Sequence, residues 1–146
     1  MRTLYVTDLD GTLLNSESEI SPYSSDLISA LSQDGALITI ATARTPATVE
    51  HILRTTYVSI PVIVMTGASM WDNTAKRYIE PHFLDPDTCR EVKRMIKEHG
   101  VNPFTYTLGD DGCLEVFHAH DLTAVEQKFV DERRHLRLKH FHFDDP

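Results

Sequence analysis

Two carboxylates one residue apart, Asp8 and Asp10, directly follow an apolar and β-branched run over residues 3–7. That run predicts a buried strand. Because alternate residues of a strand share a face, both carboxylates are expected on one side, with Leu9 pointing into the core. One carboxylate could attack an electrophile while the other handles a proton, and both could face a cation. Asp8 and Asp10 are therefore the candidate catalytic and metal-binding pair.

The segment has a simpler interpretation, in which Asp10-Gly11 is an ordinary turn or Asp8 caps a helix. Gly11 allows a sharp turn beside a ligand, and the hydroxyl of Thr12 could tie that turn together. The strand before the carboxylates and the Leu13-Leu14 pair after them favour the functional interpretation.

A second polar group, Thr42-Ala43-Arg44, follows the apolar run over residues 36–41, which predicts another strand. The carboxyl ends of neighbouring parallel strands share one rim of the sheet, where ligands bind in open α/β folds. A threonine hydroxyl, free backbone N–H groups and an arginine suit phosphate oxygens. Alternatively, Thr42 only caps a helix and Arg44 is a solvated surface charge. The two groups together favour a phosphate site.

The elements that position these residues alternate between strand and helix. A helix is expected from Ser21-Pro22 to Gly35, with Leu27, Ile28 and Leu31 on its apolar face. Another begins at Thr45-Pro46, with Val49, Ile52 and Leu53 inward, and a third strand covers residues 62–65. This βαβαβ order predicts an α/β, Rossmann-like parallel sheet.

The pattern changes after residue 68. We expect a turn at residues 72–74 between short strands, a helix over 85–98, strands at 104–108 and 114–118, a helix over 123–134 and a strand over 136–143. Gly109-Asp110-Asp111-Gly112 is best interpreted as a hairpin turn. We place a boundary near residues 68–82, which gives a first domain over residues 1–70 and a second, α+β domain over residues 71–146.

Composition excludes several classes of protein. A net charge of -8 over 146 residues argues against nucleic-acid binding. There is no apolar run that could span a bilayer and no signal-peptide pattern, so we expect a cytoplasmic protein without a membrane partner. Cys89 and Cys113 lack a CxxC pattern and are expected to be reduced, with their pairing left open. His140 and His142 would share a strand face and could bind metal. A His-rich exposed face is favoured, since no Cys or acidic ligand is firmly placed beside them.

Three motifs carry a resemblance to a known family: DLDGTLL at residues 8–14, ATAR at 41–44 and TGA at 66–68. The chain resembles the haloacid dehalogenase-like (HAD) superfamily, specifically its Cof-type sugar-phosphatase branch. The resemblance is close over residues 1–70; beyond them only an α/β cap domain matches. Ala43 stands where the family usually has Gly, and Thr66 where it has Asn. These departures affect the backbone approach to phosphate and one polar arm of the site.

The resemblance implies a Mg²⁺-dependent phosphatase of small phosphorylated metabolites such as sugar phosphates. Asp8 would form an aspartyl phosphate, and Asp10 would protonate the leaving alcohol and then activate water. Mg²⁺ would bind the Asp8 carboxylate and the Asp10 backbone carbonyl. The residues implied for phosphate binding are Leu9, Thr42, Ala43 and Arg44. A cap over the site would exclude water and select the substrate.

Family members also use a Lys and a GDxxxD-type acidic motif, both after the cap. Asp110 lies too early for that motif, and Lys76, Lys93 and Lys97 are not strong candidates for the family's Lys. We therefore expect an incomplete HAD-like core with part of a cap, an N-terminal portion of such an enzyme. One alternative is a non-catalytic truncated chain that acts as a binding or assembly partner, as a homodimer or with a complementing chain. Another is a mutase-like phosphotransferase that uses Asp8 in the same way.

Overall fold

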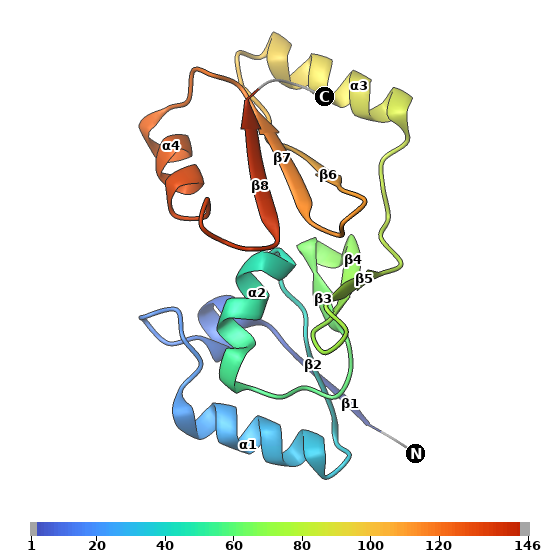
Figure 1. The fold of residues 1–146 in the computed structure, drawn as a ribbon, viewed down its shortest axis with the longest axis vertical. Helices are drawn as coiled ribbons and strands as arrows, with labels where there is room; N and C mark the ends of the chain where they lie inside the picture. The colour runs from blue at the N-terminus through green and yellow to red at the C-terminus, as the bar shows by residue number, and fades with distance from the viewer. Residues whose placement is uncertain (1–2, 144–146) are drawn as a thin grey trace. The chain divides into compact units, whose positions relative to one another are not determined.

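The computed structural model describes residues 3–143 and divides the chain into two compact units, with the division between His82 and Phe83 (Figure 1). Both units are mixed α/β structures, as the sequence predicts. Over residues 3–143, the longest helices are too short and too polar to cross a lipid bilayer.

The first unit contains a parallel strand pair that continues into an antiparallel sheet. β1 and β2 run parallel, with Thr7 opposite Ile40. A parallel bridge from Ala41 to Ile63 brings β3 beside β2, and β3, β4 and β5 then pair antiparallel in that order. This confirms the predicted βαβαβ order. The elements are β1 (Leu4–Thr7), a π-type turn (Leu9–Leu13), α1 (Pro22–Gln33), β2 (Leu37–Ile40), α2 (Pro46–Ile52), a 3-10 turn (Leu53–Thr55), β3 (Val62–Val64), a second 3-10 turn (Met65–Gly67), β4 (Ser69–Asp72) and β5 (Arg77–Ile79).

Local sequence signals set the helix starts in this unit. The Ser21 side chain accepts a hydrogen bond of 3.2 Å from the backbone N–H of Ser24, and Pro22 is the first helical residue of α1. Pro46 likewise begins α2. The predicted inner face of α2 is confirmed, because Val49, Ile52 and Leu53 are buried. Those three side chains belong to the unit's core, together with Leu9, Ile40, Val62, Val64 and Trp71.

The prediction that β1 is a buried strand is wrong. Leu4, Tyr5 and Val6 are 50% to 60% exposed. Among the described strands β1 pairs only with β2, so its second edge carries no neighbour. The predicted apolar face of α1 is also partly open, with Leu27 and Leu31 more than 40% exposed. An apolar pattern indicates that a face is suited to burial, but it does not show which part of a protein packs against that face.

Among its described residues, the second unit is a three-stranded sheet with two helices, which can be followed in Figure 1. β6 and β7 pair antiparallel through the Gly109–Gly112 turn, which confirms the predicted hairpin, and β7 and β8 pair parallel. The predicted last helix is shorter than expected, because the N–H groups of Arg133 and Arg134 both bond to the Val130 carbonyl and form a turn. The elements are α3 (Pro86–Glu98), β6 (Thr105–Leu108), β7 (Leu114–His118), α4 (Ala124–Asp131) and β8 (Lys139–Phe143).

A lysine lies in the core of the second unit. Lys139 is only 3% exposed, on the buried face of the sheet with Leu114 and Val116. Its Nζ lies 5.6 Å from the centre of the Tyr106 ring and 5.9 Å from that of Phe129. Burial, and secondarily the charge of Arg133, lowers the pKa of Lys139 to about 8.

Candidate active site

The ends of β1 and β2 bring the two predicted polar groups to one rim of the sheet. The N–H of Ala41 donates to the carbonyl of Thr7 at 2.9 Å. Asp8 follows Thr7 and Thr42 follows Ala41, so the chain leaves the sheet at neighbouring points. The parallel pairing predicted from sequence therefore places the carboxylate motif beside the threonine motif.

The π-type turn Leu9–Leu13 fixes the carboxylates. Leu9 is fully buried, as predicted, so only its backbone can contribute to a phosphate site. Its carbonyl accepts a hydrogen bond of 2.9 Å from the Leu14 N–H, which closes the turn. Gly11 adopts a φ of +74°, a left-handed conformation that favours glycine. Asp8 and Asp10 are left exposed on either side of the Leu9 anchor.

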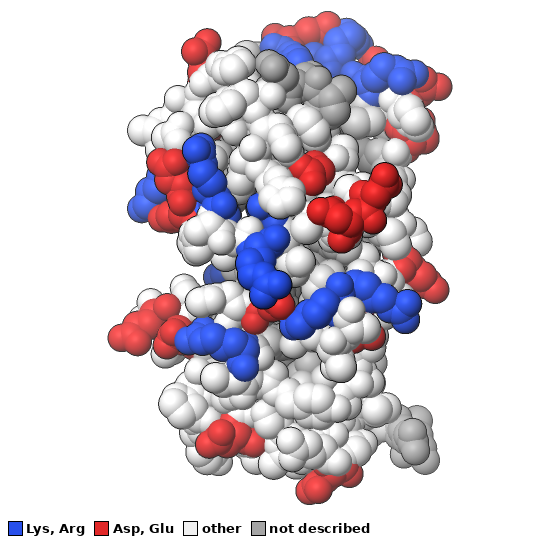
Figure 2. All heavy atoms as spheres, viewed as in Figure 1, with Lys and Arg blue, Asp and Glu red and all other residues white. Residues whose placement is uncertain are grey.

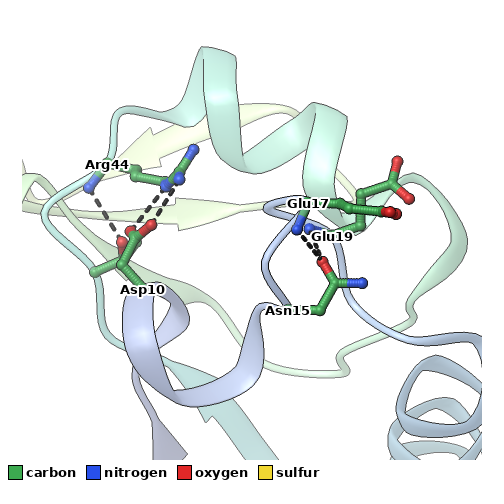
Figure 3. Close-up of polar contacts among 6 residues, drawn as sticks. Asp10, Asn15, Glu17, Glu19 and Arg44 are labelled. Carbon is green, nitrogen blue, oxygen red and sulfur yellow. Dashed lines mark hydrogen bonds and ion pairs between the residues drawn. The ribbon is translucent and has the colours of Figure 1, made fainter.

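Asp10 and Arg44 form a two-armed ion pair across the rim (Figure 3). Arg44 Nε donates to Asp10 Oδ2 at 2.8 Å and Nη2 donates to Oδ1 at 2.6 Å. The hydrogen bonds from Arg44 are the main cause that lowers the pKa of Asp10, and the pKa of Arg44 is raised in turn. Asp10 is therefore held ionised, and Arg44 is directed at a carboxylate.

Thr42 and Ala43 lie in a loop that is held by backbone hydrogen bonds and by one hydrogen bond to the Thr42 side chain. Thr42 is buried, and its Oγ1 accepts a hydrogen bond of 3.1 Å from the Arg44 N–H. The Thr42 N–H donates a hydrogen bond of 3.0 Å to the Ile63 carbonyl, and the Thr42 carbonyl accepts one of 3.1 Å from the Thr66 N–H. Accepting from Arg44 leaves the Thr42 hydroxyl proton available for a phosphate oxygen. Ala43 is exposed between these anchors, where its backbone can approach a ligand.

The chain after β3 makes a strained turn against the same loop. Met65, Thr66 and Gly67 have φ values of +53°, +57° and +89°. The two non-glycine residues each incur a cost of about 1–3 kcal/mol in this left-handed region. The Met65 N–H donates to the Arg44 carbonyl at 3.0 Å, so the turn is bonded to both ends of the Thr42–Arg44 loop.

The segment after the carboxylate turn folds back on itself. Asn15 Oδ1 accepts hydrogen bonds of 3.0 Å from the N–H groups of Glu17 and Glu19 (Figure 3). Leu14 and Ile20 form an antiparallel bridge. Local hydrogen bonds therefore hold the segment from Leu14 to Ile20 in a closed loop.

The donors at Asp8 and Asp10 fit a hard cation such as Mg²⁺, which prefers carboxylate and carbonyl oxygens. Asp8 is exposed and its side chain makes no capping hydrogen bond to the turn that follows it. The Asp10 carboxylate is engaged by Arg44, so its backbone oxygen is the better donor. Lys76 Nζ pairs with Glu50 Oε1 at 3.1 Å, and Lys93 and Lys97 belong to α3.

Comparisons with known proteins agree with this geometry. The model of the haloacid dehalogenase-like hydrolase family matches residues 5–144. The chain is 33% identical to the 5-amino-6-(5-phospho-D-ribitylamino)uracil phosphatase YwtE of Bacillus subtilis, over 75% of this chain and 37% of that protein. It is 29% identical to a protein of Mycoplasma pneumoniae, over 86% of this chain and 47% of that protein.

Solved structures show the same fold. A haloacid dehalogenase-like hydrolase from Bacteroides thetaiotaomicron matches with a TM-score of 0.70 and 17% identity, over 100% of this chain and 53% of that one. A haloacid dehalogenase-like hydrolase from B. subtilis matches with a TM-score of 0.69 and 17% identity, over 97% of this chain and 54% of that one. The chain spans less than half the length of the curated relatives it matches and about half of these structures.

Proposed function

This chain belongs to the haloacid dehalogenase-like hydrolases, and we propose that it carries the nucleophile half of a Mg²⁺-dependent phosphatase of small phosphorylated metabolites. Its curated relatives include phosphatases that act on a phosphorylated ribitylamino compound. A small phosphate monoester, such as a sugar phosphate, is the corresponding substrate class. The observation that supports the proposal most strongly is the convergence of Asp8 and Asp10 with the Thr42–Arg44 loop at one rim.

In the proposed reaction an Asp8 carboxylate oxygen attacks phosphorus, and the bond from phosphorus to the substrate oxygen breaks. The leaving alcohol takes a proton from Asp10. Asp10 then accepts a proton from water as that water attacks the aspartyl phosphate, which releases inorganic phosphate and restores Asp8. Mg²⁺, when bound by Asp8 and the Asp10 backbone oxygen, would neutralise charge on the transferring phosphoryl group.

In this proposal Arg44 exchanges its partner, from Asp10 in the free chain to the phosphate of a bound substrate. In the free chain its guanidinium lowers the pKa of Asp10, which suits a base but not an acid. A bound phosphate competes for the same guanidinium, because arginine binds phosphate and carboxylate with the same two-armed geometry. Transfer of Arg44 to the phosphate would raise the pKa of Asp10 and let it carry the proton that the leaving alcohol needs.

The setting we propose is a cytoplasmic one, with neither nucleic acid nor membrane as partner. Cys89 and Cys113 are free, which is consistent with a reducing compartment. On the face drawn in Figure 2, basic side chains are interspersed with acidic ones. Nucleic-acid binding surfaces instead collect Lys and Arg on one face.

The test is release of phosphate from 4-nitrophenyl phosphate by residues 1–146, with and without Mg²⁺. Asp8→Asn should abolish the release while leaving the circular dichroism spectrum unchanged. Asp26→Asn, at an exposed position on α1, is the matched control and should retain full activity. No Mg²⁺-dependent release from a folded sample would refute the proposal for this chain.

A second candidate function is assembly through β1, without catalysis. It is favoured by the exposed apolar side chains of β1 and by its second edge, which no described strand occupies. An open apolar strand edge readily pairs with another polypeptide. We propose that β1 accepts a strand from a second copy or from a complementing chain.

Light scattering after size exclusion tests the self-association form of this proposal. The chain should elute with the mass of a dimer, and Val6→Lys on β1 should convert it to a monomer. Val125→Lys, at an exposed site on α4, is the matched control and should leave the dimer intact. A monomer at all concentrations would count against the pairing of two copies.

A further inference from the structure

A group of metal-binding side chains gathers at one end of the second unit's sheet, whereas the residues proposed for catalysis belong to the first unit. Asp111, Cys113 and His140 each offer a ligand atom, and these atoms all lie within 4.8 Å of one another. Asp111 and Cys113 belong to the β6–β7 turn and its exit, whereas His140 is the second residue of β8. We propose that this group is a binding site for a divalent transition metal of the Zn²⁺ type.

The sheet register explains why residues so distant in sequence converge. β7 and β8 run parallel, and Glu115 is directly opposite His140. Cys113 precedes β7 by one residue, so it is expected on the same side of the sheet as Glu115. The hairpin then brings Asp111 back over this end, and Asp111 Oδ1 accepts a hydrogen bond of 3.0 Å from the Cys113 N–H.

Glu115 gives the site a supporting carboxylate. Its Oε1 lies 3.1 Å from His140 Nδ1, and its Oε2 contacts His142 Nε2. Carboxylates that hydrogen-bond imidazoles fix the ring orientation of metal-binding histidines and increase their basicity. Glu115 and His142 therefore stand beside the three ligands as orienting groups, or as a source of the fourth ligand.

The donor set selects the class of metal. A thiolate, an imidazole and a carboxylate together suit Zn²⁺ and similar transition metals, whereas Mg²⁺ prefers oxygen ligands alone. In a tetrahedral zinc site, bonds of about 2.0–2.3 Å place ligand atoms about 3.3–3.8 Å apart. The separations here are within 4.8 Å, and Asp111 and His140 are both exposed. Small side-chain rotations can therefore close the site.

Simpler interpretations explain less of this arrangement. A His-rich strand face neutralised by Glu115 accounts for His140 and His142, but not for the approach of Asp111 and Cys113. A reactive thiol would account for Cys113 alone, and not for the approach of Asp111 and His140 to within 4.8 Å of it. A metal would draw the thiol, the imidazole and the carboxylate into one bonded group and tie the hairpin to β8.

The experiment is a titration of residues 1–146 with Co²⁺, a spectroscopic stand-in for Zn²⁺, followed by displacement with Zn²⁺. We expect one equivalent of Co²⁺ to give a thiolate charge-transfer band in the near ultraviolet, and Zn²⁺ to remove it. Cys113→Ser should abolish that band, and Glu115→Gln should weaken metal binding by about 10- to 100-fold. Cys89→Ser is the matched control, because Cys89 lies on α3, and the band should persist.

Asp111→Asn, on the exposed turn, provides a variant with little effect on folding and should weaken Co²⁺ binding while the circular dichroism spectrum is unchanged. Absence of a thiolate band with the folded chain would overturn the proposal. So would a band that survives Cys113→Ser, or Co²⁺ affinity that is equal in Asp111→Asn and the unmodified chain.

Discussion

Lys139 is expected to destabilise the second unit in a pH-dependent way. It is 3% exposed among aromatic rings, and its pKa is lowered from 10.5 to about 8. A lysine whose pKa is depressed by folding takes up a proton more readily in the unfolded chain. The folded state is therefore penalised below pH 8, and the penalty disappears as the pH rises from the folded pKa to the unfolded one.

The size of the effect follows from the two pKa values. The shift corresponds to a penalty of about 3 kcal/mol at pH 7 and about 1 kcal/mol at about pH 9.5. Attraction between the ammonium and the rings of Tyr106 and Phe129 would offset part of this, by about 0.5–2 kcal/mol. Lys139→Met keeps an unbranched side chain of similar length and removes the charge, so it should stabilise the unit at pH 7 by about 1–3 kcal/mol. The difference in unfolding free energy between Lys139→Met and the unmodified chain should therefore shift by about 2 kcal/mol against the variant between pH 7 and about pH 9.5.

The assay is urea unfolding at the two pH values, followed by far-ultraviolet circular dichroism. Trp71, the chain's one tryptophan, lies in the first unit, so its fluorescence reports separately on that unit. Lys128→Met, at an exposed position on α4, is the control and should show no pH-dependent difference from the unmodified chain. Destabilisation by Lys139→Met at pH 7, or an equal change in stability at both pH values, would show that the buried charge of Lys139 does not penalise the folded state.

Three further predictions concern individual hydrogen bonds and ion pairs. Arg44→Met should raise the pKa of Asp10, measured by carboxyl NMR titration; the stabilisation from the ion pair should be about 1 kcal/mol or less. Because the Asp10 pKa is lowered by folding, that stabilisation should be present at neutral pH and lost as the pH falls below 3.8. Thr42→Val leaves the Arg44 N–H without its acceptor, so it should cost about 1–3 kcal/mol in urea unfolding and weaken binding of inorganic phosphate. Thr123→Ala removes the capping box with Glu126 and should lower the stability of α4 by about 1 kcal/mol, whereas Thr123→Ser should preserve it.

The elements predicted most accurately have local signals. Ser21-Pro22 at the start of α1 and the Gly109–Gly112 hairpin turn were recognisable because hydrogen bonding and backbone preference act between near neighbours. The parallel pairing of β1 and β2 followed from the strand–helix–strand order. Together these were sufficient to predict that Asp8 and Thr42 lie at one rim.

Other features depend on contacts that sequence patterns do not reveal. The exposure of Leu4 to Val6 could not be predicted, since a β-branched run is the same whether or not another strand covers it. The pair between Asp10 and Arg44 joins residues 34 positions apart and requires the geometry of two loops. Asp10 and Arg44 were each identified as site residues, but their mutual bond carries no sequence signal.

The proposed metal site at Asp111, Cys113 and His140 also depends on contacts that the sequence does not reveal. The alternation of His140 and His142 was visible, but their neighbours Asp111 and Cys113 come from a hairpin whose register only the folded sheet defines. A pattern within one strand identified His140, and the hairpin and cross-strand pairing supply Asp111 and Cys113.

Identification of the residue that is phosphorylated during turnover would test directly whether Asp8 is the nucleophile. Residues 1–146 would be mixed with 4-nitrophenyl phosphate and Mg²⁺, quenched in acid, digested and analysed by mass spectrometry. We expect one phosphoryl group on Asp8 that hydroxylamine removes, and no label in Asp8→Asn. Turnover without that label, or a label on another residue that persists in Asp8→Asn, would contradict the assignment of Asp8 as the nucleophile.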